Sequence, residues 1–176
     1  MSTATASSNN QDHRLRLRGN STSRKARVST EGQVYFLTMA TMYRRPVFQD
    51  TDVCRCVCRA AHQAWVWRDS NLLAWVLMPD HWHGLVRLGR HDDLSPLIGR
   101  FKAVTARAVP ERARVNGWLW HRGFQDQALR DDDDVRMMAR YLVANPLRAG
   151  IVDDLGRYPY WNATWIGQSS DDVIPI

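Results

Sequence analysis

The sequence lacks any long apolar run, and this absence excludes several classes of protein. None of its hydrophobic stretches approaches the roughly 20 residues that a membrane-spanning helix requires. The first 33 residues also lack the apolar core of a secretory signal peptide. We therefore expect an intracellular protein without a membrane anchor.

Cysteine is scarce, and the three cysteines lie in one short stretch at Cys54, Cys56 and Cys58. An odd number of thiols with no distant partner provides no disulfide framework. Cys54 and Cys58 are one helical turn apart, whereas Cys56 points elsewhere. We interpret the three as small core or boundary residues rather than as metal ligands.

Acidic residues are outnumbered, with 18 Asp and Glu against 24 Lys and Arg, so the net charge is +6 and the isoelectric point is about 9.7. A basic surface favours polyanions, chiefly nucleic acid. Residues 1–32 are rich in Ser, Thr and Asn and then in Arg, which predicts a disordered basic arm. Such an arm either contacts phosphate backbones or is a tail without a role.

The apolar pattern predicts one domain of alternating strands and helices. The expected strand–helix–strand–strand–helix–strand order matches the split βαβ pattern of an α+β, ferredoxin-like sandwich with an antiparallel sheet, and a further helix follows. The first strand is apolar throughout and should be buried on both faces. In chain order the expected elements are 34–42, 52–67, 72–77, 85–88, 93–109, 118–120 and 132–144.

A His-x-His motif follows the Pro-Asp turn that joins the two strands of the expected hairpin. Side chains two apart on a strand share a face, so His81 and His83 should stand together, with Trp82 on the opposite face. Two imidazoles on one strand form half of a metal site and need further ligands. The motif alone favours two ordinary histidines at a sheet edge, because so short a match often arises by chance.

A second motif lies about sixty residues later, on the last expected helix. Tyr141 lies about 100° from the core residue Leu142, at the edge of the apolar stripe. Asn145 is four residues further on and shares the face of Tyr141, and Pro146 ends the regular helix. None of the other four tyrosines combines a helix edge with an amide one turn away, yet by itself Tyr141 is more simply a boundary residue.

Several segments follow one another in a fixed order. They are Tyr43–Phe48, Met78–His83, Phe101–Lys102, Trp120–Arg130 and Tyr141–Val152. The runs Gly-Phe-x-Asp-x-Ala-Leu-Arg and Tyr-x-x-x-Asn-Pro-x-Arg-Ala-Gly within them are specific, whereas His-x-His is not. This series, over residues 34–161, resembles the REP-associated tyrosine transposases, which are single-tyrosine members of the HUH endonuclease superfamily.

The resemblance implies a metal-dependent enzyme that cleaves single-stranded DNA at imperfect palindromic chromosomal repeats. Residues 33–165 would form the catalytic domain, with a C-terminal tail at 166–176. The cofactor would be Mg²⁺ or Mn²⁺, and the partner would be hairpin DNA of REP-type repeats. No protein or membrane partner is implied, and the expected location is the bacterial cytoplasm, in association with the nucleoid. By analogy we expect a monomer that uses its own tyrosine, rather than a dimer that exchanges it.

Carried onto this sequence, the resemblance assigns His81 and His83 as metal ligands and Asn145 as a third, amide ligand. It assigns Tyr141 as the nucleophile that attacks the scissile phosphate and forms a 5′-phosphotyrosine. From charge alone, we add four DNA contacts: Arg44, Arg45, Lys102 and Arg148.

Two other functions stay open at this point. The fold could serve a sequence-specific DNA-binding protein that no longer cuts, although His81, His83, Tyr141 and Asn145 are all present. A metal-dependent enzyme with a small substrate is the third interpretation, and the basic surface weighs against it. The sequence identifies no general base for Tyr141.

Overall fold

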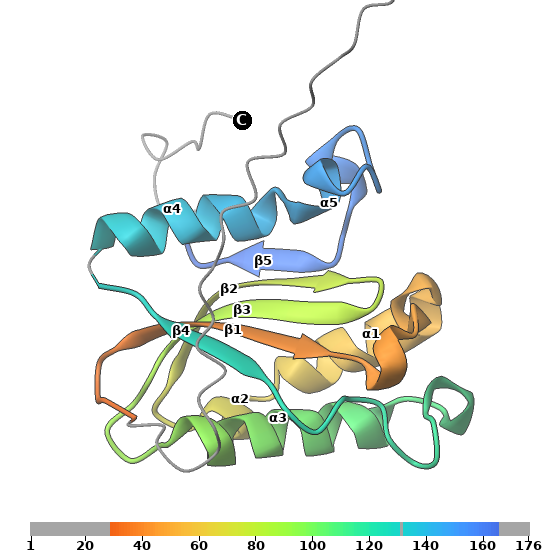
Figure 1. Cartoon of the computed structure of the whole chain (residues 1–176), viewed down its shortest axis with the longest axis horizontal. Helices are drawn as coiled ribbons and strands as arrows, with labels where there is room; N and C mark the ends of the chain where they lie inside the picture. The colour runs from red at the N-terminus through yellow and green to blue at the C-terminus, as the bar shows by residue number, and fades with distance from the viewer. Residues whose placement is uncertain (1–28, 131, 166–176) are drawn as a thin grey trace, which may run out of the picture.

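The computed structural model describes residues 29–130 and 132–165. Most of the expected N-terminal arm, 1–28, and the expected tail, 166–176, lie outside the described residues. No helix within the described part is both long and apolar enough to cross a bilayer. The strands and longer helices are β1 Val34–Ala40, α1 Thr51–Ala61, α2 Ala64–Trp67, β2 Asn71–Met78, β3 His81–Arg87, α3 Leu94–Ala108, β4 Gln125–Ala128, α4 Asp132–Val143, α5 Asn145–Arg148 and β5 Trp161–Ala163 (Figure 1).

A five-stranded antiparallel sheet forms the middle of the molecule, in the order β4-β1-β3-β2-β5. Its first four strands, with α1 and α3, form the expected ferredoxin-like sandwich, so the predicted α+β fold class is confirmed. In the pairing of β1 with β3, Thr38 lies opposite His83 and Ala40 lies opposite His81. This register brings the end of β1 beside the His-x-His motif.

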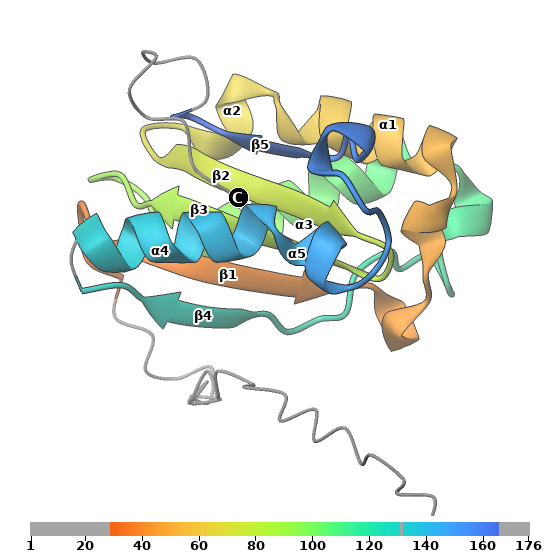
Figure 2. The same cartoon turned by 90° about the horizontal axis from the view of Figure 1, so that it is seen from above.

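Helices cover both faces of the sheet, as Figures 1 and 2 show. Alternate side chains of β1 enter two separate hydrophobic clusters. Tyr35, Leu37 and Met39 pack with α1 and α3, whereas Val34 and Phe36 pack with α4. The expectation that this strand is buried on both faces is therefore confirmed, and the additional layer comes from the helix that carries Tyr141.

The expected helix 52–67 is interrupted. Asp50 caps α1, because its Oδ1 accepts hydrogen bonds from the backbone N–H groups of Asp52 at 2.9 Å and Val53 at 3.3 Å. The helix ends at Ala61, and α2 starts only at Ala64. The indole N–H of Trp67 donates to the carbonyl of Ala61 at 2.7 Å. This buried bond stabilises the break, which the continuous apolar pattern did not indicate.

The expected strand at 118–120 is wrong. Trp118 and Trp120 form only isolated bridges, to Val115 and Thr41 respectively, and the fourth strand is β4 at Gln125–Ala128. Because β4 is a partly exposed edge strand of sequence Gln-Asp-Gln-Ala, it has no alternation of apolar and polar residues to reveal it.

The C-terminal segment adds a fifth strand that the sequence pattern did not indicate. β5 pairs with the outer side of β2 over only three residues. The buried Tyr158 hydroxyl donates to the carbonyl of Leu77 at 2.5 Å, and the Leu77 N–H donates to the carbonyl of Tyr160 at 2.9 Å. These contacts attach the segment after α5 to the sheet edge.

The indole of Trp82 fixes the position of the His-x-His strand. Trp82 is 1% exposed and packs on the α3 side of the sheet, with its ring centroid 4.8 Å from that of Phe101. The ring lies over Gly84, where an added Cβ would approach it to 2.0 Å. Glycine is therefore required two residues after the tryptophan, on the face away from the histidines.

We expect Gly84→Ala to destabilise the fold by about 1–3 kcal/mol, because the new methyl group must displace a buried indole. The measurement is the free energy of unfolding in urea. Gly99→Ala is the matched control, since Gly99 is exposed within α3 and has nothing within 4 Å of its added Cβ. This control should be neutral or stabilising by up to about 1 kcal/mol. Equal stability changes in the two variants would contradict the packing argument.

Candidate active site

The two histidines of the His-x-His motif lie on the same face of β3. Their ring centroids are 4.5 Å apart, with an interplanar angle of 76°. The His83 ring also stacks on Phe36, with centroids 5.1 Å apart, and Phe36 belongs to the cluster beneath α4. The imidazole pair therefore faces the α4 layer, while Trp82 between them faces α3, as the strand alternation predicted.

Each imidazole is held through its Nδ1 atom. His81 Nδ1 is 2.5 Å from Oδ1 of Asp80, and the other oxygen of Asp80 accepts a hydrogen bond from Arg44 at 3.2 Å. His83 Nδ1 is 2.8 Å from the hydroxyl of Thr38. Hydrogen-bond partners at Nδ1 fix the orientation of imidazoles that bind metal ions. The Nε2 atoms are then the ring nitrogens through which a metal would be bound.

The pKa values of this group favour neutral rings beside an ionised carboxylate. Burial, with a smaller contribution from the neighbouring His81, lowers the pKa of His83 to about 3. Burial also lowers the pKa of His81, although Asp80 opposes this. Burial alone would raise the pKa of Asp80, but His81 and Arg44 together outweigh it and lower the value. Neutral imidazole is the form that binds metal ions.

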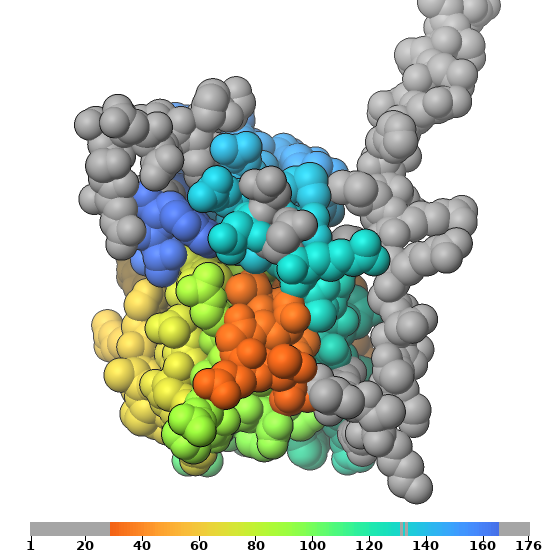
Figure 3. Space-filling model, turned by 90° about the vertical axis from the view of Figure 1, so that its left-hand side faces the viewer, coloured from red at the N-terminus to blue at the C-terminus, as the bar shows by residue number. Residues whose placement is uncertain are grey.

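The helix that carries Tyr141 covers the same face of the sheet. The C-terminal end of α4, and α5 after it, lie above the end of the sheet where β2 turns into β3 (Figures 1 and 2). The opposite end, seen in Figure 3, carries the start of β1 below the start of α4. The two motifs are thus gathered at one end of one face, although they are far apart in the sequence.

Tyr141 is half-buried against the cluster beneath α4. The guanidinium of Arg148 lies over its ring, 4.4 Å from the ring centroid. Within the described residues, no hydrogen bond joins the Tyr141 phenol to either imidazole. The structure thus brings Tyr141 together with Arg148, and places both on the face that carries His81 and His83.

Asn145 opens α5, two residues after the end of α4. Its Nδ2 atom is buried and has no hydrogen-bond partner among the described residues. A buried N–H donor without a partner costs free energy, so a hydrogen-bond acceptor is expected beside it. No group of three His, Cys, Asp or Glu side chains in the described part could hold a metal ion; a third protein ligand here would have to be of another type, such as an amide.

The loop after β1, which is strained at Tyr43 and Arg44, places Arg44 and Arg45 near this site. Tyr43 and Arg44 have φ angles of 57° and 55°, in the left-handed region that such residues rarely adopt. Tyr43 is 76% exposed and Arg45 is also exposed. Strained backbone of this kind persists where the surrounding structure holds it, and it often occurs at functional sites. Here Arg44 is held by its ion pair with Asp80.

Lys102 lies apart from the histidines, on α3 and therefore on the other side of the sheet. Its Nζ donates to the carbonyls of His121 at 2.8 Å, Arg122 at 3.3 Å and Gly123 at 2.7 Å. These bonds hold the segment that leads into β4. The structure therefore gives this lysine a role in the architecture, away from the imidazole pair.

Sequence reasoning missed two residues that support the histidines, Asp80 and Thr38. Asp80 could have been found, because it directly precedes His81 in the motif. Thr38 could not, because only the register of β1 against β3 places it opposite His83. Arg148 was assigned to DNA from its charge, and nothing in the sequence indicated its contact with Tyr141.

Comparison with known proteins shows what this arrangement is similar to. The family "Transposase IS200 like" matches residues 29–145. A Haemophilus influenzae protein assigned as a REP-associated tyrosine transposase is 27% identical, over 74% of this chain and 80% of its own. A REP-associated tyrosine transposase of Escherichia coli is 26% identical, over 53% of this chain and 54% of its own.

A solved structure is also similar to this one. It is a REP-associated tyrosine transposase bound to a REP hairpin, with a TM-score of 0.62 and 26% identity, and the match covers 79% of this chain and 81% of the other. The resemblance to REP-associated tyrosine transposases is therefore confirmed. Because the family match extends from the residues before β1 to Asn145 and spans well over half of the sequence, the chain belongs to the family of IS200-like transposases.

Proposed function

We propose that this protein is a metal-dependent endonuclease and strand transferase for single-stranded DNA, acting at hairpins of palindromic REP-type repeats. The observation that carries this proposal is the placing of Tyr141 and the His81–His83 pair on one face, at one end of the sheet. The hairpin is inferred from the similar solved structure, which is bound to a REP hairpin. We assign the activity to residues 33–165.

The residues at this site fit a divalent cation, Mg²⁺ or Mn²⁺. His81 and His83 are neutral and oriented through Nδ1, and the side-chain amide of Asn145, at the start of α5, could supply an oxygen ligand. Three protein ligands would leave coordination positions open for phosphate oxygens. When bound, the ion would act as a Lewis acid on the scissile phosphate.

Tyr141 is the nucleophile in this proposal. Its oxygen bonds to phosphorus and its proton is lost, while the bond from phosphorus to the 3′-oxygen breaks and that oxygen takes up a proton. One phosphate ester thus replaces another, so the free 3′-hydroxyl, or a different one, can reverse the step and join strands. Arg148 lies over the Tyr141 ring, where its guanidinium can bind the phosphate that Tyr141 attacks.

We further propose that each monomer uses its own tyrosine. The apolar stripe of α4 is buried against the sheet of the same chain, with Val135, Met138 and Leu142 each at most 7% exposed. α4 also contacts β2, β3 and β5 of this chain. Burial on this scale favours a helix that stays on its own sheet rather than one exchanged with a second copy.

Replacing the proposed nucleophile should abolish covalent chemistry but not binding. With Mn²⁺ and a labelled hairpin made from the imperfect palindromes nearest the encoding gene, wild-type protein should form a denaturation-resistant protein–DNA adduct in a single turnover, and chelator should prevent it. Tyr141→Phe should reduce adduct formation by about 1,000-fold or more. Its affinity for the hairpin should stay within about twofold of wild type.

Tyr160→Phe is the matched control, because Tyr160 lies beside Tyr158 just before β5 and outside the proposed site. It should form the adduct at the wild-type rate. An adduct that persists in Tyr141→Phe would remove the nucleophile assignment. If the wild-type protein bound the hairpin but formed no adduct with either Mg²⁺ or Mn²⁺, it would instead be a DNA-binding protein that does not cut.

Removing the carboxylate that orients His81 should weaken the binding of the metal ion that cleavage requires. For Asp80→Ala we expect the Mn²⁺ concentration at half-maximal cleavage to rise by about 10- to 100-fold, because losing the carboxylate that orients a metal-binding imidazole typically weakens metal affinity by this factor. Raising the Mn²⁺ concentration should then restore much of the rate. The measurement is the cleavage rate across a Mn²⁺ titration.

Asp69→Ala provides the control, since Asp69 also contacts a histidine Nδ1, that of His91 at 3.3 Å, but on an exposed loop. It should leave the Mn²⁺ midpoint unchanged. If Asp80→Ala and Asp69→Ala gave the same midpoint as wild type, the proposed metal role of His81 would be wrong.

A further inference from the structure

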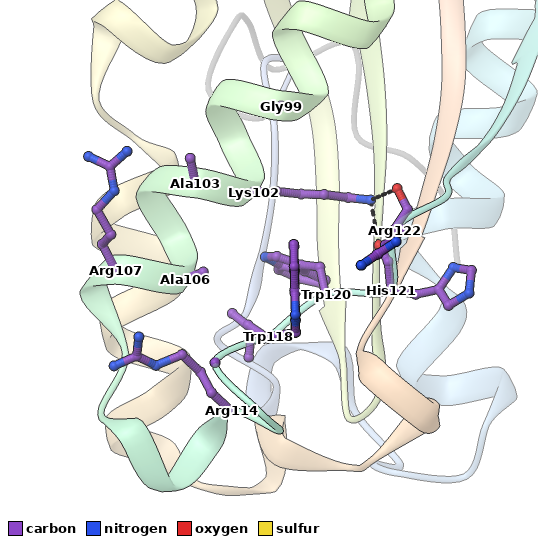
Figure 4. A pocket seen from close by; sticks show the side chains of 12 residues that line it. Gly99, Lys102, Ala103, Ala106, Arg107, Arg114, Trp118, Trp120, His121 and Arg122 are labelled. Carbon is purple, nitrogen blue, oxygen red and sulfur yellow. Dashed lines mark hydrogen bonds between the residues drawn. The ribbon is translucent and has the colours of Figure 1, made fainter. Parts of the chain in front are cut away.

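A second candidate site lies on the other side of the sheet, between α3 and the segment before β4 (Figure 4). We call it the Trp118 pocket; it is a hollow of about 550 Å³. Of the twelve described residues that line it, four are basic and none is acidic. The basic residues are Lys102, Arg107, Arg114 and Arg122. This charge favours an anionic ligand.

The aromatic wall of the pocket is held by a tight turn. Val115 and Trp118 exchange backbone hydrogen bonds of 2.8 and 2.9 Å. Between them, Asn116 and Gly117 both have positive φ, 50° and 82°. Asn-Gly with two positive φ angles is typical of a type I′ turn, which closes a hairpin tightly. Trp118 is therefore held on a rigid support, although it is 48% exposed.

An exposed tryptophan with an arginine beside it is suited to bind a nucleobase. The Arg122 guanidinium lies 5.3 Å from the Trp118 ring centroid. Bases of unpaired nucleic acid stack on such aromatic faces with little dependence on sequence, while arginines contact the backbone phosphates. Arg114 also lines the pocket, and its buried Nε atom has no hydrogen-bond partner in the described part.

Hydrogen bonds to α3 fix the residues at the bottom of the pocket. The buried Trp120 donates its indole N–H to the Thr105 hydroxyl on α3 at 2.8 Å. Lys102 is bonded to the carbonyls that follow Trp120, as the dashed lines in Figure 4 indicate. A pocket with such a fixed floor and wall can bind a ligand without a large ordering cost.

The pocket lies on the other face of the sheet from the histidines, but its backbone is two strand spacings from theirs. The His121 N–H donates to the carbonyl of Ala40 at 2.9 Å, and Ala40 lies opposite His81 in the β1–β3 pairing. Neighbouring strands are about 5 Å apart, so the backbone of this segment lies about 10 Å from that of His81. A DNA strand could therefore pass from one site to the other around the end of the sheet.

We propose that the Trp118 pocket binds an unpaired base of the single-stranded DNA that flanks the hairpin. The base stacks on Trp118, and Arg107, Arg114 and Arg122 contact the adjoining phosphates. This inference rests on the proposed function for its choice of DNA as the ligand. Paired bases inside a duplex expose no face for stacking, so the pocket distinguishes single strands from double strands.

The test is equilibrium binding of a fluorescent oligothymidine of about 12 nucleotides, a length within the usual range of single-strand sites, compared with a blunt duplex of equal length. Trp118→Ala should weaken binding of the single strand by about 5- to 150-fold, the loss typical of one base stack, and leave duplex binding within twofold. Trp118→Phe should restore most of the affinity, because phenylalanine keeps an aromatic face. Trp65→Ala, which removes a 55% exposed tryptophan from α2, should have no effect.

Several results would overturn the inference: an equal loss for the two DNA forms, an equal loss in Trp118→Ala and Trp65→Ala, or tighter binding of an oligouridine than of the oligothymidine. The hairpin adduct assay on the same protein tests the proposed function separately. If Trp118→Ala lost single-strand binding while the wild-type protein formed no adduct, the pocket proposal would stand and the nuclease proposal would be rejected. If the wild-type protein formed the adduct and Trp118→Ala bound single strands as well as wild type, the nuclease proposal would stand and the pocket proposal would be rejected.

Discussion

The burial of Trp82 against α3 is the contact on which the rest of the structure depends. A strand places neighbouring side chains on opposite faces, so burying this indole among Phe101 and Trp67 obliges His81 and His83 to face α4. Gly84 leaves room for the ring. The hydrophobic core on one side of the sheet thus determines that the two histidines lie on the other side.

On that side, the histidines are supported by elements remote in sequence. Thr38 reaches His83 from β1, and Asp80 joins His81 to Arg44 in the strained loop. α4 then covers the same face and carries Tyr141, with Arg148 over its ring. The other side of the sheet bears the Trp118 pocket, and the end of β1 connects the two regions through Ala40. The match to the family of IS200-like transposases covers residues 29–145, which include both regions except Arg148.

Much of this was predictable from sequence, because strong periodicity reports burial directly. β1, the hairpin, α3 and α4 all carry apolar patterns that match their surroundings, and the alternation at His81, Trp82 and His83 predicted their faces correctly. β4 was misplaced because an edge strand of Gln-Asp-Gln-Ala has no apolar face, and β5 was missed because it is only three residues long. The roles of Thr38 and Arg148 depend on contacts between distant elements, which local patterns do not report.

The most direct measurement of the central claim is the effect of bound Mn²⁺ on ¹⁹F resonances in protein labelled with 3-fluorotyrosine. Paramagnetic broadening falls steeply with distance from the ion. If Tyr141 and the histidine pair share one site, Mn²⁺ should broaden the Tyr141 resonance far more than that of Tyr35, which packs on the opposite face, and His81→Ala should abolish the difference. Broadening of Tyr141 no greater than that of Tyr35, with Mn²⁺ bound through His81, would contradict the account.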